Sequence, residues 1–244
     1  MSSESSADIV SLSGNPILRH GEACAWQPAQ GEMCLEQISE HIEAHLGPVA
    51  TVFHEIVSDT VHIDVHLVAP SADFPFARLV TSGMSDLPMT LPEGVAAPRY
   101  LELVMTLPGD WRLQQDAFDD ERWYWPIRLL KGLARLPHKH ATWLGWGHTV
   151  PNGDPAEPYA ANTALDGAIV LPSVTVPDGF EELAVDADKT IHFLAVVPLY
   201  PEEMALKLRE GSDALLDRFA AHEISDIIDP QRRNVVRKRR WWQR

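Results

Sequence analysis

The sequence predicts an α+β fold in which helices flank a mixed, largely antiparallel β-sheet. Three short apolar runs follow one another between residues 51 and 89, which is typical of consecutive strands joined by hairpins. Stretches with helical periodicity lie before and after these runs. Strands and helices do not alternate strictly, so a wholly parallel βαβ sheet is not expected.

The first three predicted strands cover residues 51–57, 60–68 and 78–81. Residues 58 and 59 separate the first two strands, a spacing that suits a tight hairpin. The middle strand alternates, with four apolar residues on one face and three polar residues on the other: Val61, Ile63, Val65 and Leu67 against His62, Asp64 and His66. A period of two is the signature of a strand, because successive side chains leave opposite faces.

Four helices are expected. Residues 33–46 place apolar side chains three and four positions apart, and Gly47-Pro48 ends that helix. Pro126 fits the first turn of a second helix that runs to Leu136, before Pro137. Pro201 opens a third helix that ends near Gly211, and Ser212 can cap a fourth.

The remaining segments complete the sheet. Further strands are expected over residues 99–107, 140–150, 168–176 and 190–197, with a loop after Gly145. The first of them does not alternate cleanly, which indicates burial on both faces. Residues 151–163 are predicted to form a surface loop and residues 181–189 an acidic turn.

One folded domain is expected, because the chain contains neither a linker-like tract nor an internal repeat. We assign residues 1–30 to a flexible N-terminal segment, 31–230 to the domain and 231–244 to a basic C-terminal tail. The tail could contact the acidic body, a nucleic acid or an anionic membrane.

The chain is acidic, with 35 Asp and Glu against 20 Lys and Arg, a net charge of −15. Residues 230–244 hold seven of the basic residues and no acid, so the remainder carries 13 bases, 35 acids and a net charge of −22. Such a body repels nucleic acid and favours basic partners. The simpler alternative is that the acidity only keeps the protein in solution.

Cellular context follows from what the sequence contains. Cys24 and Cys34 do not form a disulfide framework, and the first ten residues are polar rather than a secretory signal. No run of 18 apolar residues is present, so no membrane span is expected. The sequence predicts a cytoplasmic protein that binds neither membrane nor nucleic acid. It also shows neither a Walker A motif nor a GxGxxG motif, and no cofactor is predicted.

Two patterns could carry chemistry. His62, Asp64 and His66 share one face of a strand, and two imidazoles with a carboxylate could bind zinc or iron in a metal-dependent enzyme. A half-solvated strand shows the same alternation, so no metal site is assigned. Ser85 lacks the Gly that a nucleophile elbow needs, because Leu87 stands there. We expect a turn in which Gly83 takes a positive φ and Ser85 or Asp86 bonds the backbone.

Tryptophan is concentrated in one part of the chain, with five residues from position 111 to position 146: Trp111, Trp123, Trp125, Trp143 and Trp146. Two interpretations stay open, core packing and a groove for a partner. Trp146-Gly147-His148 is the best candidate for a groove, because Gly147 would let another backbone approach.

Five segments in order resemble the Suppressor of fused domain family: HIDVHLVAP, LVTSGMSDLPM, YLELVMTLP, WPIRLLKGLARL and YPEEMALKLREGSDALL. The resemblance runs from about Glu36 to Val236. It implies a sheet flanked by helices like the N-terminal domain of the eukaryotic protein, whose C-terminal domain has no counterpart here. That protein clamps a short peptide between its two domains. Leu136 stands where the eukaryotic helix has Tyr, and Trp146-Gly147-His148 where it has Gly-Asp-His, so the peptide-clamping contacts are not expected here.

The resemblance also implies a function. Single-domain bacterial members look like immunity proteins of toxin systems, which bind and block one toxin without catalysis. An acidic body suits a basic toxin, because complementary charge speeds capture. We expect Trp146, His148, Asp64 and His66 to line the partner-facing region. A general protein-interaction module and, less favoured, a metal-dependent enzyme using His62, Asp64 and His66 are the alternatives.

Overall fold

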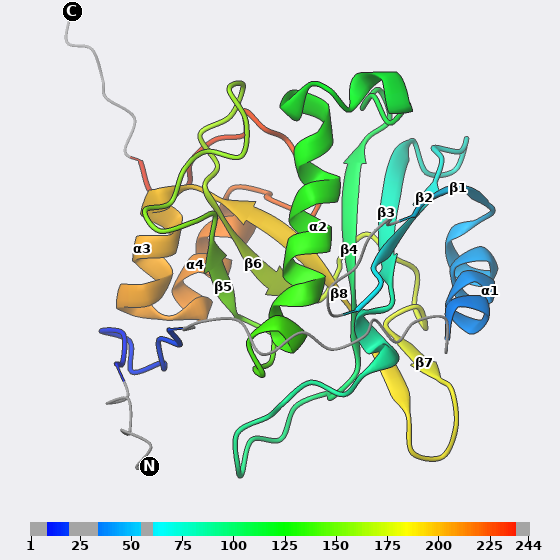
Figure 1. The fold of residues 1–244 in the computed structure, drawn as a ribbon. Helices are drawn as coiled ribbons and strands as arrows, with labels where there is room; N and C mark the ends of the chain where they lie inside the picture. The colour runs from blue at the N-terminus through cyan, green and yellow to red at the C-terminus, as the bar shows by residue number, and fades with distance from the viewer. Residues whose placement is uncertain (1–8, 20–33, 55–60, 238–244) are drawn as a thin grey trace, which may run out of the picture.

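The computed structural model describes residues 9–19, 34–54 and 61–237, and they form one mixed sheet covered by helices on both faces (Figure 1). Within these residues the sheet has eight strands in the order β1-β2-β3-β4-β8-β6-β5, with β7 paired to β8. The strands are β1 Val49–Phe53, β2 Asp64–Val68, β3 Phe76–Ser82, β4 Leu101–Pro108, β5 Thr149–Pro151, β6 Gly167–Leu171, β7 Glu182–Ala184 and β8 Thr190–Leu199.

The predicted α+β class and antiparallel character are confirmed. Strands β1 to β4 follow one another as antiparallel neighbours, as the consecutive apolar runs indicated. The sheet becomes mixed where β4 pairs with β8 in parallel, through residues 101–104 and 192–195. Strand β4 is buried along both faces, which explains its lack of alternation.

Alternate residues of the central strands belong to two separate cores. Leu79 of β3 and Leu103 of β4 pack toward α2 (Glu121–Lys139), where Trp125 is fully buried. Val80 and Val104, their neighbours in sequence, pack on the opposite face toward α1 (Leu35–Leu46). The other end of that second face is covered by α3 (Pro201–Glu210) and α4 (Ser212–Ala221).

Helix α2 differs from the prediction at both ends. It begins at Glu121 because the side chain of Asp120 accepts a hydrogen bond from the Arg122 backbone N–H. Pro126 therefore lies in the second turn and not at the start. Pro137 also lies inside the helix, which continues to Lys139. Both prolines are buried, and the packing of this face outweighs the backbone hydrogen bonds that they remove.

The predicted strand over residues 140–150 is wrong for most of its length. Only β5 forms there, because the chain turns at Ala141 and Gly147, whose φ angles are +45° and +75°. Strand β6 stops before Pro172, earlier than predicted, since proline has no N–H to donate to a sheet. The predicted acidic turn contains the short strand β7.

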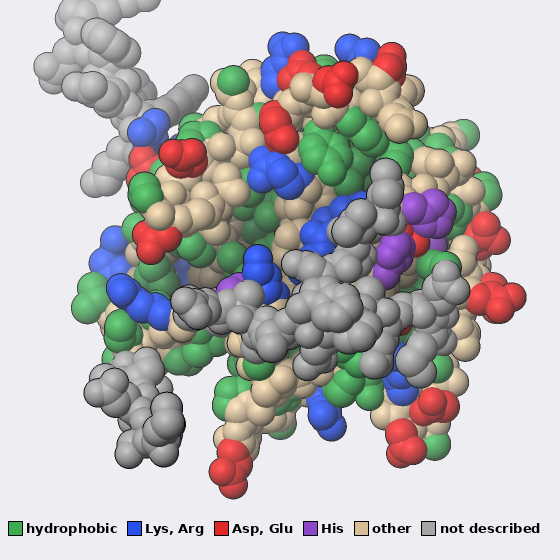
Figure 2. All heavy atoms as spheres, in the orientation of Figure 1, with side chains coloured by type: hydrophobic (Ala, Val, Ile, Leu, Met, Phe, Trp, Pro, Cys, Tyr) green, Lys and Arg blue, Asp and Glu red, His purple; other side chains and the backbone are tan. Residues whose placement is uncertain are grey.

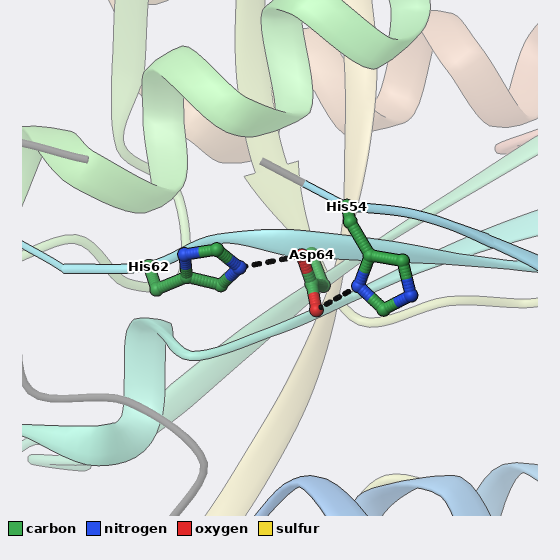
Figure 3. A group of neighbouring side chains, drawn as sticks. All are labelled: His54, His62 and Asp64. Atoms are coloured by element: carbon green, nitrogen blue, oxygen red, sulfur yellow. Dashed lines mark hydrogen bonds and ion pairs between the residues drawn. The ribbon is translucent and has the colours of Figure 1, made fainter. Parts of the chain in front are cut away.

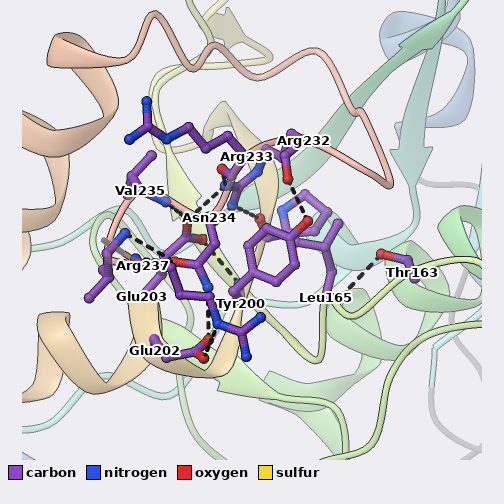
Figure 4. A network of polar contacts seen from close by, with 12 residues as sticks. Thr163, Leu165, Tyr200, Glu202, Glu203, Arg232, Arg233, Asn234, Val235 and Arg237 are labelled. Carbon is purple, nitrogen blue, oxygen red and sulfur yellow. Dashed lines mark hydrogen bonds and ion pairs between the residues drawn. The ribbon is translucent and has the colours of Figure 1, made fainter. Parts of the chain in front are cut away.

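A polar network holds the C-terminal segment against α3 (Figure 4). The guanidinium of Arg232 donates to both carboxylate oxygens of Glu203 at 2.7 and 2.5 Å, and to the carbonyl of Pro198 at 2.8 Å. The Val235 backbone N–H also donates to Glu203, and the Tyr200 hydroxyl donates to the carbonyl of Arg232. The first residues of the predicted basic tail are thus packed against the domain.

This ion pair gives the first prediction. Arg232→Ala removes the cation from a fully buried carboxylate, so the free energy of unfolding should fall by about 3–5 kcal/mol. Arg237→Ala is the matched control, because Arg237 pairs with Glu202 while 76% of its side chain is exposed. That change should cost less than about 1 kcal/mol. Urea unfolding measures both, and equal losses in the two variants would contradict the buried pair's importance.

Candidate functional site

Two of the four residues that sequence analysis favoured for partner binding, Trp146 and His148, come just before the end strand β5. It pairs with β6 on one side, and no other strand among the described residues pairs with it. Trp146, just before β5, has 53% of its surface exposed. His148 is half-buried against Trp143, with ring centroids 4.1 Å apart. Burial and the nearby Lys207 ammonium lower the pKa of His148 to about 4, so this imidazole is neutral at physiological pH.

The N-terminal stretch, residues 9–19, and Gly147 both approach the junction between α3 and α4. The Ser13 backbone N–H donates to the Leu208 carbonyl, and Ser13 contacts Gly211. A Cβ at Gly147 would lie 3.1 Å from the hydroxyl of Ser212, so both stretches meet the α3–α4 junction. We define the β5 surface as Trp146 together with the exposed apolar side chains of this stretch: Ile9, Val10, Leu12 and Leu18. These five are most of the large apolar residues exposed in the described part of the chain.

A second cluster lies at the other end of the sheet, where Asp64 sits between two histidines (Figure 3). Asp64 Oδ2 is 2.8 Å from His54 Nδ1, and Oδ1 is 3.0 Å from His62 Nε2. Asp64 is buried, whereas two-thirds of the His54 side chain is exposed. Figure 2 shows histidine side chains gathered at the surface on this side of the molecule.

The structure therefore brings His62 and Asp64 together, as the strand pattern suggested. The second histidine beside Asp64 is His54 and not the expected His66. His66 lies apart, hydrogen-bonded to the Ser82 hydroxyl at 2.9 Å, and burial lowers its pKa. Sequence reasoning missed His54, which lay inside the predicted strand over residues 51–57 but directly follows β1 in the structure. The β1–β2 register pairs Phe53 with Val65. That register would have placed His54 opposite Asp64.

The four residues predicted to line a partner-facing region do not share one patch. Trp146 and His148 lie beside β5, whereas Asp64 and His66 lie on β2, near the opposite edge of the sheet. Asp64 and His66 are only 4% and 1% exposed. Of the four, Trp146 presents the most surface to a partner.

The turn Gly83–Asp86 has a structural explanation. Gly83 has a φ of +100°, as predicted, and a Cβ there would lie 1.9 Å from the carbonyl oxygen of His62. Ser85 or Asp86 was expected to bond the backbone; of these two, the Ser85 hydroxyl instead donates to the Glu102 side chain, at 2.6 Å from Oε1. Ser85 is fully buried. A substrate could not reach it, which removes the case for a catalytic serine.

Glu102 is a fully buried carboxyl group held by three donors. The Ser85 N–H and hydroxyl donate to one oxygen, and the Thr81 hydroxyl donates to the other at 2.6 Å. Burial raises the pKa of Glu102 to about 7, because desolvation of the charged form outweighs these hydrogen bonds. Glu102 is consequently protonated in the folded protein over a pH range in which it ionises in the unfolded chain.

Known proteins resemble this chain in both sequence family and fold. The family model for the Suppressor of fused protein matches residues 59–233, and the chain belongs to this family. No curated protein sequence matches the chain. The fold is similar to the crystal structure of a Suppressor of fused homologue from Neisseria gonorrhoeae FA 1090, with a TM-score of 0.60 and 14% identity, covering 83% of this chain and 97% of that one. It is also similar to the relative in the Sufu–Fu complex, with a TM-score of 0.55 and 14% identity, covering 82% and 91%.

These comparisons bear on the sequence-based expectations. The fold like that of the Suppressor of fused N-terminal domain is confirmed, and this domain fits a non-enzymatic protein-binding module. In the described residues, no helix has the length and apolar character needed to cross a membrane. His54, His62 and Asp64 are the one group in those residues with three side chains placed to hold a metal ion.

Glu102 gives the second prediction. A carboxyl group whose pKa is raised in the folded state stabilises the fold at low pH and loses that contribution as the pH rises toward the folded value. Relative to Glu102→Gln, the wild-type free energy of unfolding should therefore fall by about 3 kcal/mol between pH 4.5 and pH 8, then stay level. Urea unfolding across this range measures the difference. The exposed change Glu93→Gln is the control, and a wild-type curve parallel to that of Glu102→Gln would contradict the assignment.

Proposed function

We propose that this chain is an immunity protein that binds a basic toxin domain and blocks it without catalysis. The observation that carries the proposal is the β5 surface: Trp146 is exposed at one end of the sheet, and the N-terminal stretch that approaches the same α3–α4 junction also exposes apolar side chains. Contiguous exposed apolar groups mark protein-interaction sites, and tryptophan is enriched among the residues that dominate binding energy. Family membership supports a binding role for such a surface.

Strand β5 is short and ends in proline, so a partner is expected to contact side chains here and not to pair with the strand backbone. The strand has only three residues and ends at Pro151, which cannot donate a hydrogen bond from its backbone. A short edge strand with proline resists the addition of another strand. A partner at this end would therefore gain most of its affinity by covering Trp146 and the apolar residues of 9–18, with His148 and Trp143 packed behind.

Charge supports a basic partner. Asp154 and Glu157, in the loop after β5, are exposed, and so is Asp213 at the start of α4 beside the contact with Gly147. The chain as a whole carries a net charge of −15. A positively charged domain would be drawn to this surface, and its association rate would fall as salt screens the attraction.

The third prediction concerns the β5 surface and uses the protein encoded next to this chain as the binding partner. If that neighbour is a toxin, its expression alone should arrest the growth of the host cells. Co-expression of this chain should restore their growth. Trp146→Ala should weaken binding at least about tenfold in calorimetry, because the change removes a large exposed aromatic anchor. Val174→Ala is the matched control, since Val174 is an exposed apolar residue outside the β5 surface.

A double variant tests whether the negative charge of the loop after β5 attracts the partner. Asp154→Lys with Glu157→Lys should slow association, and the difference from wild type should shrink at high salt. Binding without any growth arrest would favour the alternative of a general protein-interaction module. Unchanged affinity of a folded Trp146→Ala protein would contradict the β5 surface as the contact.

A further inference from the structure

Three ligand atoms of the kinds that zinc prefers converge at the join between β1 and β2. His54 Nδ1, His62 Nε2 and a carboxylate oxygen of Asp64 all lie within 4.8 Å of one another. His54 follows the last residue of β1, Asp64 is the first residue of β2, and His62 comes two residues earlier. Each imidazole faces a different oxygen of the same carboxylate, as Figure 3 shows.

We propose that His54, His62 and Asp64 bind a divalent transition-metal ion, with zinc as the best match. Two neutral imidazole nitrogens and one carboxylate oxygen form a ligand set found in three-ligand zinc sites. The imidazoles that now contact the carboxylate would turn their nitrogens toward a shared ion. Zinc prefers four ligands, so a water molecule or a side chain of a partner would complete the site.

The surroundings allow an ion to enter and hold the carboxylate in place. Most of the His54 side chain is exposed and His62 is about one-third exposed, whereas Asp64 is fixed in the sheet by its register with Ser82. Among the residues that the structure describes, two charged or titratable groups outside the cluster interact with it. Lys131 of α2 donates to the His54 carbonyl at 3.4 Å and feels the charge of Asp64.

The second neighbouring group is His66, which lies two residues from Asp64 on the same strand face and feels the charges of both Asp64 and His54. A bound ion would link the end of β1 to the start of β2, at the edge of the sheet opposite the β5 surface. Zinc binding would therefore be measurable without any protein partner.

The experiment uses the full chain without a histidine tag, after removal of metal with a chelator. Calorimetric titration with zinc should show one site per chain, and zinc should raise the melting temperature, because the ion binds the folded state. Cobalt substitution should give the visible absorption of a four-coordinate centre. His54→Ala and the isosteric Asp64→Asn should each weaken zinc binding by about tenfold or more.

His192→Ala is the matched control, because His192 forms a histidine–carboxylate pair with Glu182 that is not part of any three-ligand group in the described residues. That variant should bind zinc as the wild type does. The proposal is overturned if wild type shows no saturable zinc site, or if folded His54→Ala and Asp64→Asn bind zinc as tightly as wild type. Should His54→Ala fail to fold, the cobalt spectra of wild type and Asp64→Asn still decide the matter.

Discussion

The buried carboxyl group of Glu102 joins the segments on which the centre of this fold depends. It binds the Ser85 turn and the Thr81 hydroxyl, and that hydroxyl accepts a hydrogen bond from the Leu103 N–H. It therefore holds β3 and the following turn to β4, the strand at which antiparallel pairing gives way to parallel pairing with β8. The same turn brings Gly83 against the carbonyl of His62, which fixes the chain just before β2. Burial raises the pKa of Glu102 to about 7, so this hydrogen-bonded carboxyl group is mostly uncharged below that pH, and ionisation inside the core costs free energy.

A second buried acidic side chain, Glu203 of α3, plays a comparable part as one half of an ion pair. Glu203 accepts hydrogen bonds from the Tyr200 and Val235 N–H groups and is paired with Arg232. The network fixes the start of α3 and with it the α3–α4 junction, where Ser13 and Gly147 make their contacts. The buried Arg232–Glu203 ion pair and the packed C-terminal segment therefore support the elements next to the β5 surface.

The sequence was most informative where one periodic pattern decides an element. The apolar spacing predicted α1 correctly, because one buried face determines that helix. The alternation around Val65 correctly predicted a strand, although β2 begins only at Asp64 and its polar face is buried as well. It was least informative where tertiary contacts compete with local preference. Proline at position 126 indicated a helix start, but the Asp120 cap and the burial of Trp125 set the start earlier. His54 joined Asp64 through strand register, which a one-dimensional pattern does not reveal.

Several residues of the motifs that carry the family resemblance are buried. Family membership therefore indicates the fold but does not identify the partner. Gly83 avoids a backbone collision, while Ser85 and Glu102 bond each other in the interior, so none of the three can meet another protein. Selection for folding alone would keep them together. Specificity for one partner must instead come from side chains that reach the surface, such as Trp146 and the apolar residues near Leu12. Two relatives could therefore share every buried motif residue and still bind different proteins.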